Sequence, residues 1–285
     1  MDKSLSDHIN ELADLVDDRN LRDTLKESVV SGQNSLNKVE RCFDLLPALP
    51  WSPETLAMFL NSWKATHLKM LAIYGLSCRL QRLAMKAEEN SPMREQLMLA
   101  SARNAETSYE DLGLDYGGET HARLYNNFAE QLLGNFPWSL EKYCLQEARE
   151  FRGWIYENMV VSEIEIGLLT NMFSEIYNHA EYNIALNAFG TFIDRHYHFS
   201  TAERETTLQY IYAHVADETE VDHFLVVVKA LEAYSRATDT TIDYQQVGTV
   251  FQEYLHRIGS VMESLIAAME RERNAAKNAS IAGVF

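Results

Sequence analysis

The chain has 285 residues and a formal net charge of −17, with 46% apolar and 11% aromatic residues. A chain of this length and apolar content can build a large core, which excludes wholesale disorder. The acidic charge argues against a nucleic-acid-binding protein and against binding to an anionic membrane, because both need a basic surface. The 12 glycines and 5 prolines are about half the usual share, so long helices joined by few turns are expected.

The sequence carries no visible signal for export or membrane insertion. No apolar run approaches the roughly 18 residues that a spanning helix needs, and the segment after Met1 has no apolar signal-peptide region. Cys42, Cys78 and Cys144 are odd in number, lie far apart and form no C-x-x-C pair. A reduced, cytoplasmic protein without a disulfide framework is therefore expected.

Apolar periodicity and helix-start signals predict helices along the whole chain. Ser52-Pro53-Glu54 is a cap followed by proline at the first helical position, and Ser200-Thr-Ala-Glu203 is a capping box. No segment has the pattern of a strand. The expected helices lie around Leu12–Val16 and Leu21–Val29 and over residues 35–46, 53–86, 91–112, 119–133, 139–158, 162–195 with an interruption or kink near Gly190, 200–237 and 239–275.

This pattern predicts an all-α protein with one main domain. Residues 1–50 are expected to form an N-terminal helical extension on a helical core of residues 51–275. The last residues, 276–285, are expected to be a frayed tail. No internal repeat or low-complexity linker divides the chain.

Three places put histidines and carboxylates where they are unusual for helix surfaces. The first is the segment from Glu110 to His121, which contains Gly113, Gly117 and Gly118, the only glycine cluster in the chain. A glycine break between Glu110 and His121 can bring both side chains to one place. The alternative is a carboxylate at a helix end and a surface histidine near a turn.

The second place is Glu181, which lies in a strongly apolar helix. It shares a helix face with Tyr177 and Ile184, at spacings of four and three residues. A carboxylate inside a core helix costs several kcal/mol unless it is paired or bound to a metal. A salt-bridged structural glutamate is the alternative.

The third place is an acidic run that begins at His214. His214, Glu218 and Asp222 share a helix face at spacings of four residues, and Asp217 lies next to that face. His223 is nine residues from His214, about 180° around a helix, so it points away unless the helix is distorted. The alternative is a solvated acidic face. Together the three places supply the histidine and carboxylate ligands of a di-iron or di-manganese site in a helical bundle.

On these residues the chain resembles the haem-oxygenase-like di-metal oxidases and oxygenases, relatives of the TenA-like and PqqC-like helical proteins. The resemblance covers about residues 55–235. It implies a haem-oxygenase-like seven-helix bundle core, here with the N-terminal extension. It also implies that Glu110 is the first carboxylate ligand, His121 the first histidine, and Glu181 the middle carboxylate, preferred to Glu175 because Glu175 lies further upstream.

The terminal ligand cluster departs from the family pattern. His214 matches its first histidine, and Glu218 stands where the family has aspartate. The second histidine of the pattern would fall at Val221. One of three nearby residues would have to replace it: Asp217, Asp222 or, less favoured, His223.

The resemblance implies a non-haem di-iron enzyme that uses O2 as co-substrate. Two Fe(II) ions would be bound, with Mn(II) as an alternative metal, and the reactions of the family include N-oxygenation, desaturation or C–C cleavage of amino acids, and nitrile formation. A small amine or amino acid from specialised metabolism is favoured as the substrate over a lipid, because tyrosines and histidines interleave the core helices. The residues expected to line the substrate pocket are His67, Met70, Tyr74, Tyr177 and Tyr182, with ordinary core packing as the alternative.

A substrate carboxylate would need a cation, for which Arg123 is favoured over Lys69 and Arg79. Two other functions remain open. One is a metal-free TenA-like hydrolase, which would need a nucleophilic cysteine; the other is a non-enzymatic helical protein that binds a partner through residues 1–50. The expected partners are a small-molecule substrate and a second copy of the chain in a homodimer, with no nucleic acid and no membrane.

Overall fold

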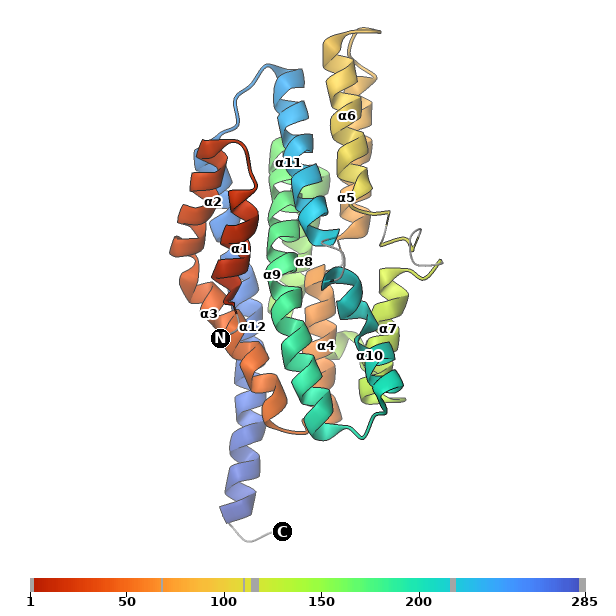
Figure 1. The fold of residues 1–285 in the computed structure, drawn as a ribbon, viewed down its shortest axis with the longest axis vertical. Coiled ribbons are helices and arrows are strands. Elements are labelled where there is room, and N and C mark those ends of the chain that lie inside the picture. The colour runs from red at the N-terminus through yellow and green to blue at the C-terminus, as the bar shows by residue number, and fades with distance from the viewer. Residues whose placement is uncertain (1–2, 68, 110, 114–117, 216–218, 282–285) are drawn as a thin grey trace.

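The computed structural model describes residues 3–67, 69–109, 111–113, 118–215 and 219–281 of the chain. Helices account for most of these residues, and no strand occurs among them. The predicted all-α fold is confirmed. Figure 1 shows long helices running roughly parallel to one another.

The N-terminal extension is three helices followed by a short 3-10 turn. They are α1 (Leu5–Asp14), α2 (Arg19–Ser31), α3 (Gln33–Leu45) and η1 (Leu46–Ala48). Ser4 and Asp7 form a capping box at the start of α1. Helices α2 and α3 lie along the last helix, α12 (Tyr244–Ile281), and α1 lies on α9 (Figure 1).

The close approach of α3 to α12 depends on a glycine. A Cβ atom at Gly259 would lie 2.7 Å from the Cβ of Ser35 and 3.0 Å from its Cα, which is too close for any side chain. Lys38 and Arg41 on α3 pair with Glu263 and Glu270 on α12. The extension is therefore packed onto the rest of the chain along the length of α3.

Helix α9 (Ile164–His196) is the central element. It contacts α1, α12, α10 (Thr201–Val215) and α11 (Thr219–Thr238), and it continues through Gly190 without the expected interruption (Figure 1). Other neighbours are α5 (Met70–Ala84), η1, α3, the π-helical turn η3 (Glu157–Val161) and Trp63, whose ring stacks on Phe189. Every residue of α9 from Gly167 to Asn178 is buried, so a polar side chain there must find its partners inside the protein.

The helix expected over 53–86 is divided into α4 (Pro53–His67) and α5, with Leu68 outside the described residues. Before the division, the hydroxyl of Thr66 and the Nδ1 of His67 both lie within hydrogen-bond distance of the Trp63 carbonyl, at 2.7 and 2.8 Å. Side chains that compete for a backbone carbonyl weaken the helix at that point. The helix expected over 200–237 is also divided, into α10 and α11.

The other elements begin or end at residues different from those expected. Helix α6 (Pro92–Glu106) ends before 112, and residues 139–158 form η2 (Glu141–Tyr143) and α8 (Gln146–Tyr156) rather than one helix. Helix α7 covers His121–Leu133. The tail expected to fray from residue 276 is helical as far as Ile281. Over the described part of the chain, no helix is both long and apolar enough to cross a membrane.

Candidate functional site

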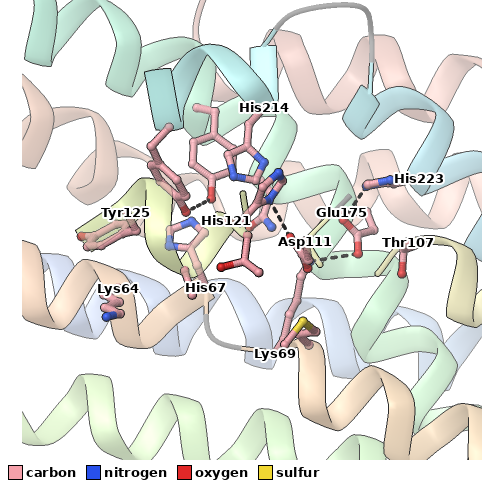
Figure 2. Close-up of a pocket in the computed structure, with 16 residues that line it drawn as sticks. Lys64, His67, Lys69, Thr107, Asp111, His121, Tyr125, Glu175, His214 and His223 are labelled. Atoms are coloured by element: carbon pink, nitrogen blue, oxygen red, sulfur yellow. Dashed lines mark hydrogen bonds and ion pairs between the residues drawn. The ribbon is translucent and has the colours of Figure 1, made fainter. Parts of the chain in front are cut away.

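A pocket of about 150 Å³ lies where three interruptions of the helical path meet. These are the α4–α5 division, the connection from α6 to α7, and the α10–α11 division; α9 supplies the wall between them. The ionisable side chains that line the pocket are Lys64, His67, Lys69, Asp111, His121, Glu175, His214 and His223 (Figure 2).

His121 is the first residue of α7, and the loop before it holds Asp111 against it. The backbone N–H of His121 donates to the Asp111 carbonyl at 3.1 Å, and His121 Nδ1 lies 2.6 Å from Asp111 Oδ1. Gly113, at φ +78°, is required in this loop because a Cβ there would lie 2.5 Å from the Glu119 carbonyl oxygen. Glu110, the predicted partner of His121, lies outside the described residues.

His214, from the end of α10, lies beside His121. Their ring centroids are 4.5 Å apart, and the His214 ring stacks on Tyr182 at 4.0 Å with the planes parallel. The pKa of His214 is held well below 6.5, because burial disfavours its charged form and the nearby His121 adds to this effect. His214 is therefore neutral near pH 7, and neutral imidazole is the form that binds metals.

Glu175 faces the same pocket from α9. Its Oε1 accepts a hydrogen bond from Lys69 Nζ at 2.9 Å, and its Oε2 lies 4.0 Å from His223 Nδ1 (Figure 2). Lys69 Nζ also donates to Ser174 Oγ at 2.7 Å. With the Asn178 amide turned so that its nitrogen donates to the Ser174 carbonyl, its oxygen accepts from Lys69 Nζ at 3.0 Å.

His223 reaches the pocket because the helical path is divided. In an unbroken helix it would point about 180° away from His214. His214 lies in α10 and His223 in α11, which are separate helices, so one helical register does not relate the two side chains. Both line the pocket.

Glu181 lies behind the pocket wall in a set of buried partners and does not line the pocket. Its Oε1 accepts from the Tyr177 hydroxyl at 2.6 Å, and its Oε2 accepts from the Trp63 indole N–H at 3.1 Å. His67 Nε2 lies 2.8 Å from the same Oε2. These contacts match the alternative given for Glu181, a paired structural carboxylate.

The remaining sequence candidates are distributed as follows. His67, Met70 and Tyr182 line the pocket, whereas Tyr74 and Tyr177 are not among its described lining residues. Asp222 is exposed on α11, and Asp217 and Glu218 lie outside the described residues.

Two of the cations expected to bind a substrate carboxylate, Arg123 and Arg79, are not among the described lining residues of the pocket. Arg123 is exposed and lies 3.6 Å from Glu119, and Arg79 donates to the carbonyls of Met159 and Ser162. Lys64, which sequence analysis missed, lines the pocket. Its ammonium donates to Asn126 Oδ1 at 2.7 Å and lies 5.0 Å from the Trp138 ring.

Lys64 and Asp111 were not proposed from the sequence, because each is a common surface residue type. Lys69 was considered only as a cation for the substrate. Glu175 was set aside because it lies upstream of Glu181, and His223 because nine residues of unbroken helix would turn it away from His214.

The donors around the pocket suit a divalent transition metal in kind, because imidazole and carboxylate are the usual ligands of Fe(II) and Mn(II). In the ranges the structure describes, no three or more histidine, cysteine, aspartate or glutamate side chains converge closely enough to hold a metal ion. Four imidazoles and two carboxylates nevertheless border one pocket. In chemical type, the donor set fits such an ion.

Comparison with solved structures finds a TenA homolog from Pseudomonas syringae pv. tomato str. DC3000. The two structures align with a TM-score of 0.59 over 86% of this chain and 93% of that one, at 11% sequence identity. The chain has a TenA-like helical fold. No protein-family model and no curated protein matches the sequence. An identity this low establishes the arrangement of the helices and not the chemistry of the pocket.

Proposed function

We propose that the chain is a non-haem di-iron oxidase or oxygenase that uses O2 to oxidise a small amine or amino acid. The observation that carries the proposal is the gathering of four histidines and two carboxylates at one pocket from separate helical segments. Such a set is unexpected in a core, because each buried polar group must be compensated by a partner.

The residues that would hold the metal ions are His121, His214, His223, Glu175 and Asp111. In this proposal Glu175 replaces Glu181 as the middle carboxylate, since Glu175 lines the pocket. His223 would serve as the second histidine of the terminal cluster, in place of the position occupied by Val221. Glu110, Glu218 and Asp217 stay candidates from the sequence, and either Fe(II) or Mn(II) suits the donors.

When bound, ferrous ions supply the redox chemistry by which O2 oxidises an organic substrate. The chain itself prepares the ligands and the substrate space. Burial keeps His214 neutral, and contact with Asp111 orients the His121 ring. The small pocket volume suits a small molecule.

Lys64 supports an amino acid as the substrate. Among the described residues no carboxylate pairs with Lys64, whose ammonium donates to Asn126, and burial lowers the pKa of this ammonium. A substrate carboxylate would supply the missing negative charge. This pocket cation replaces Arg123 in the substrate proposal.

The test is anaerobic loading of the purified protein with Fe(II), followed by desalting and metal analysis. About two Fe per chain are expected, as in other di-iron bundles, together with O2 uptake when amino acids are screened. His214→Ala and Glu175→Gln should lose most of the bound iron, and the exposed Asp222→Asn should keep it. A wild-type protein that retains no Fe(II) and takes up no O2 would contradict the proposal.

A metal-free hydrolase is less well supported. The structure describes Cys42, Cys78 and Cys144, and none is among the described lining residues of the pocket. Burial raises the pKa of the Cys42 and Cys144 thiols, which disfavours the nucleophilic thiolate. A purely partner-binding role predicted an exposed His214, whereas His214 is buried.

A further inference from the structure

We propose that Lys69 is a built-in counter-ion for Glu175 and competes with the metal for this carboxylate. A metal ion would then bind Glu175 against the positive charge of the Lys69 ammonium. The inference rests on the proposed metal site and concerns how that site is loaded.

The Lys69 ammonium is held by a complete set of acceptors. It is 7% exposed, and its three N–H groups have three oxygen partners, on Ser174, Glu175 and Asn178, at 2.7, 2.9 and 3.0 Å. All three acceptors are on α9. An ammonium satisfied in this way needs no further anion, so Lys69 is not available to bind a substrate carboxylate.

The position of Lys69 in its own helix does not explain why a lysine stands there. Lys69 occupies the N-cap of α5 and makes no side-chain capping hydrogen bond. A positive charge at a helix N-terminus is unfavourable, because the helix dipole is positive at that end. The stabilising contacts of the side chain are therefore those with α9, and Glu175 is the one that carries a charge.

Lys69 has opposite effects on the metal-free and the metal-bound forms of Glu175. Without a metal, the buried carboxylate needs a nearby cation, since an unpaired charge in the interior is strongly destabilising. With a divalent ion on Glu175, the ammonium would lie 2.9 Å from the same oxygen and next to a like charge. The two cations repel each other across one carboxylate, so each weakens the binding of the other. Lys69 therefore stabilises the metal-free protein and weakens metal binding.

The charge of Lys69 also affects His214, another proposed ligand. It is one of the positive groups that lower the pKa of His214, after burial and the neighbouring histidines. Lys64 lines the same pocket and has the same charge, but its described hydrogen-bond partner is Asn126 rather than a carboxylate. Lys64 is thus a matched control for a general effect of positive charge.

The experiment is calorimetric titration of the metal-free protein with Mn(II), an air-stable probe of the site. Lys69→Gln should bind Mn(II) about tenfold more tightly or better, since even a moderate electrostatic change gives a factor of this size. Lys64→Gln should stay within about threefold of wild type, and Lys69→Arg, which keeps the charge, should not bind more tightly than wild type. In the metal-free state, Lys69→Gln should melt at a lower temperature than Lys64→Gln.

The outcomes separate this inference from the proposed function. If the wild type binds Mn(II) and Lys69→Gln binds it equally or more weakly, the counter-ion role is wrong and the metal site stands. If Lys64→Gln tightens binding as much as Lys69→Gln, the effect is general and the specific pairing is wrong. If neither wild type nor Lys69→Gln binds Mn(II), the metal site fails and the inference fails with it. Lys69→Met is the second neutral variant if Lys69→Gln does not fold.

Discussion

Two carboxylates on α9 are both buried but have different partners. Glu181 contacts the indole of Trp63, the hydroxyl of Tyr177 and the imidazole of His67, which together surround both of its oxygens. Glu175 contacts a lysine and faces the pocket. Glu181 is thus paired with interior groups on both oxygens, whereas Glu175 is paired with the Lys69 ammonium at the pocket.

This difference predicts separate effects for two similar substitutions. Glu181→Gln should lower the free energy of unfolding by about 1–3 kcal/mol, because it weakens hydrogen bonds from buried donors. It should leave Mn(II) affinity close to that of wild type. Urea unfolding and Mn(II) titration measure the two effects, with Asp222→Asn as a surface control. Loss of Mn(II) binding with unchanged stability would instead make Glu181 a ligand.

At the scale of elements, the packing of α1 on α9 includes an edge-to-face contact between two histidines. The rings of His8 and His179 are 5.8 Å apart. The pKa of His179 is lowered from 6.5 to about 4, chiefly by burial and then by His8, with a further small contribution from Lys3 and an opposing one from Glu11. His179 is therefore neutral in the folded protein near neutral pH.

This lowered pKa predicts acid sensitivity of the α1–α9 contact. The unfolded chain binds a proton at His179 below about pH 6.5, whereas the folded chain does so only near pH 4. Stability is thus fully present above pH 6.5 and is lost as the pH falls towards 4. Allowing for partial exposure, the loss should be about 1–2 kcal/mol. Urea unfolding from pH 7 to pH 4.5 should show a shallower loss in His179→Asn, whereas the exposed His198→Asn should follow the wild type.

At the scale of the whole molecule, the N-terminal extension supplies part of the main core. Phe43 on α3 is fully buried and packs edge-to-face against Phe59, Trp63 and Phe189, which belong to α4 and α9. Trp63 in turn contacts Glu181 and the wall of the pocket. Residues 1–50 are therefore structurally continuous with the helices that position the site.

This continuity predicts that a core truncation in the extension destabilises the entire protein. Phe43→Ala should lower the unfolding free energy by about 3–5 kcal/mol, because it removes buried contacts and leaves a cavity. Val30→Ala in α2, where the side chain is 75% exposed, should change it by less than about 0.5 kcal/mol. A single urea transition, followed by both tryptophan fluorescence and circular dichroism, should shift as one unit. Two separate transitions in Phe43→Ala would mean that the extension folds independently.

Local signals in the sequence were sufficient for the fold class and for several helix starts. The proline after Ser91 and the capping box at Ser200 mark the beginnings of α6 and α10. The low glycine and proline content corresponds to the absence of strands among the described residues. Such signals act over a few residues, so they can be recognised without knowing what packs against what.

The pocket depended on contacts between distant segments. The family pattern favoured Glu181 over Glu175 by position along the chain, and uniform helical spacing placed His223 away from His214 because it assumed an unbroken helix through 200–237. The divisions at His67–Met70 and Val215–Thr219 change which side chains meet. Lys69 approaches Glu175 across 106 residues of sequence. Pairings of this kind arise from the packing of whole helices onto α9, and no local pattern encodes them.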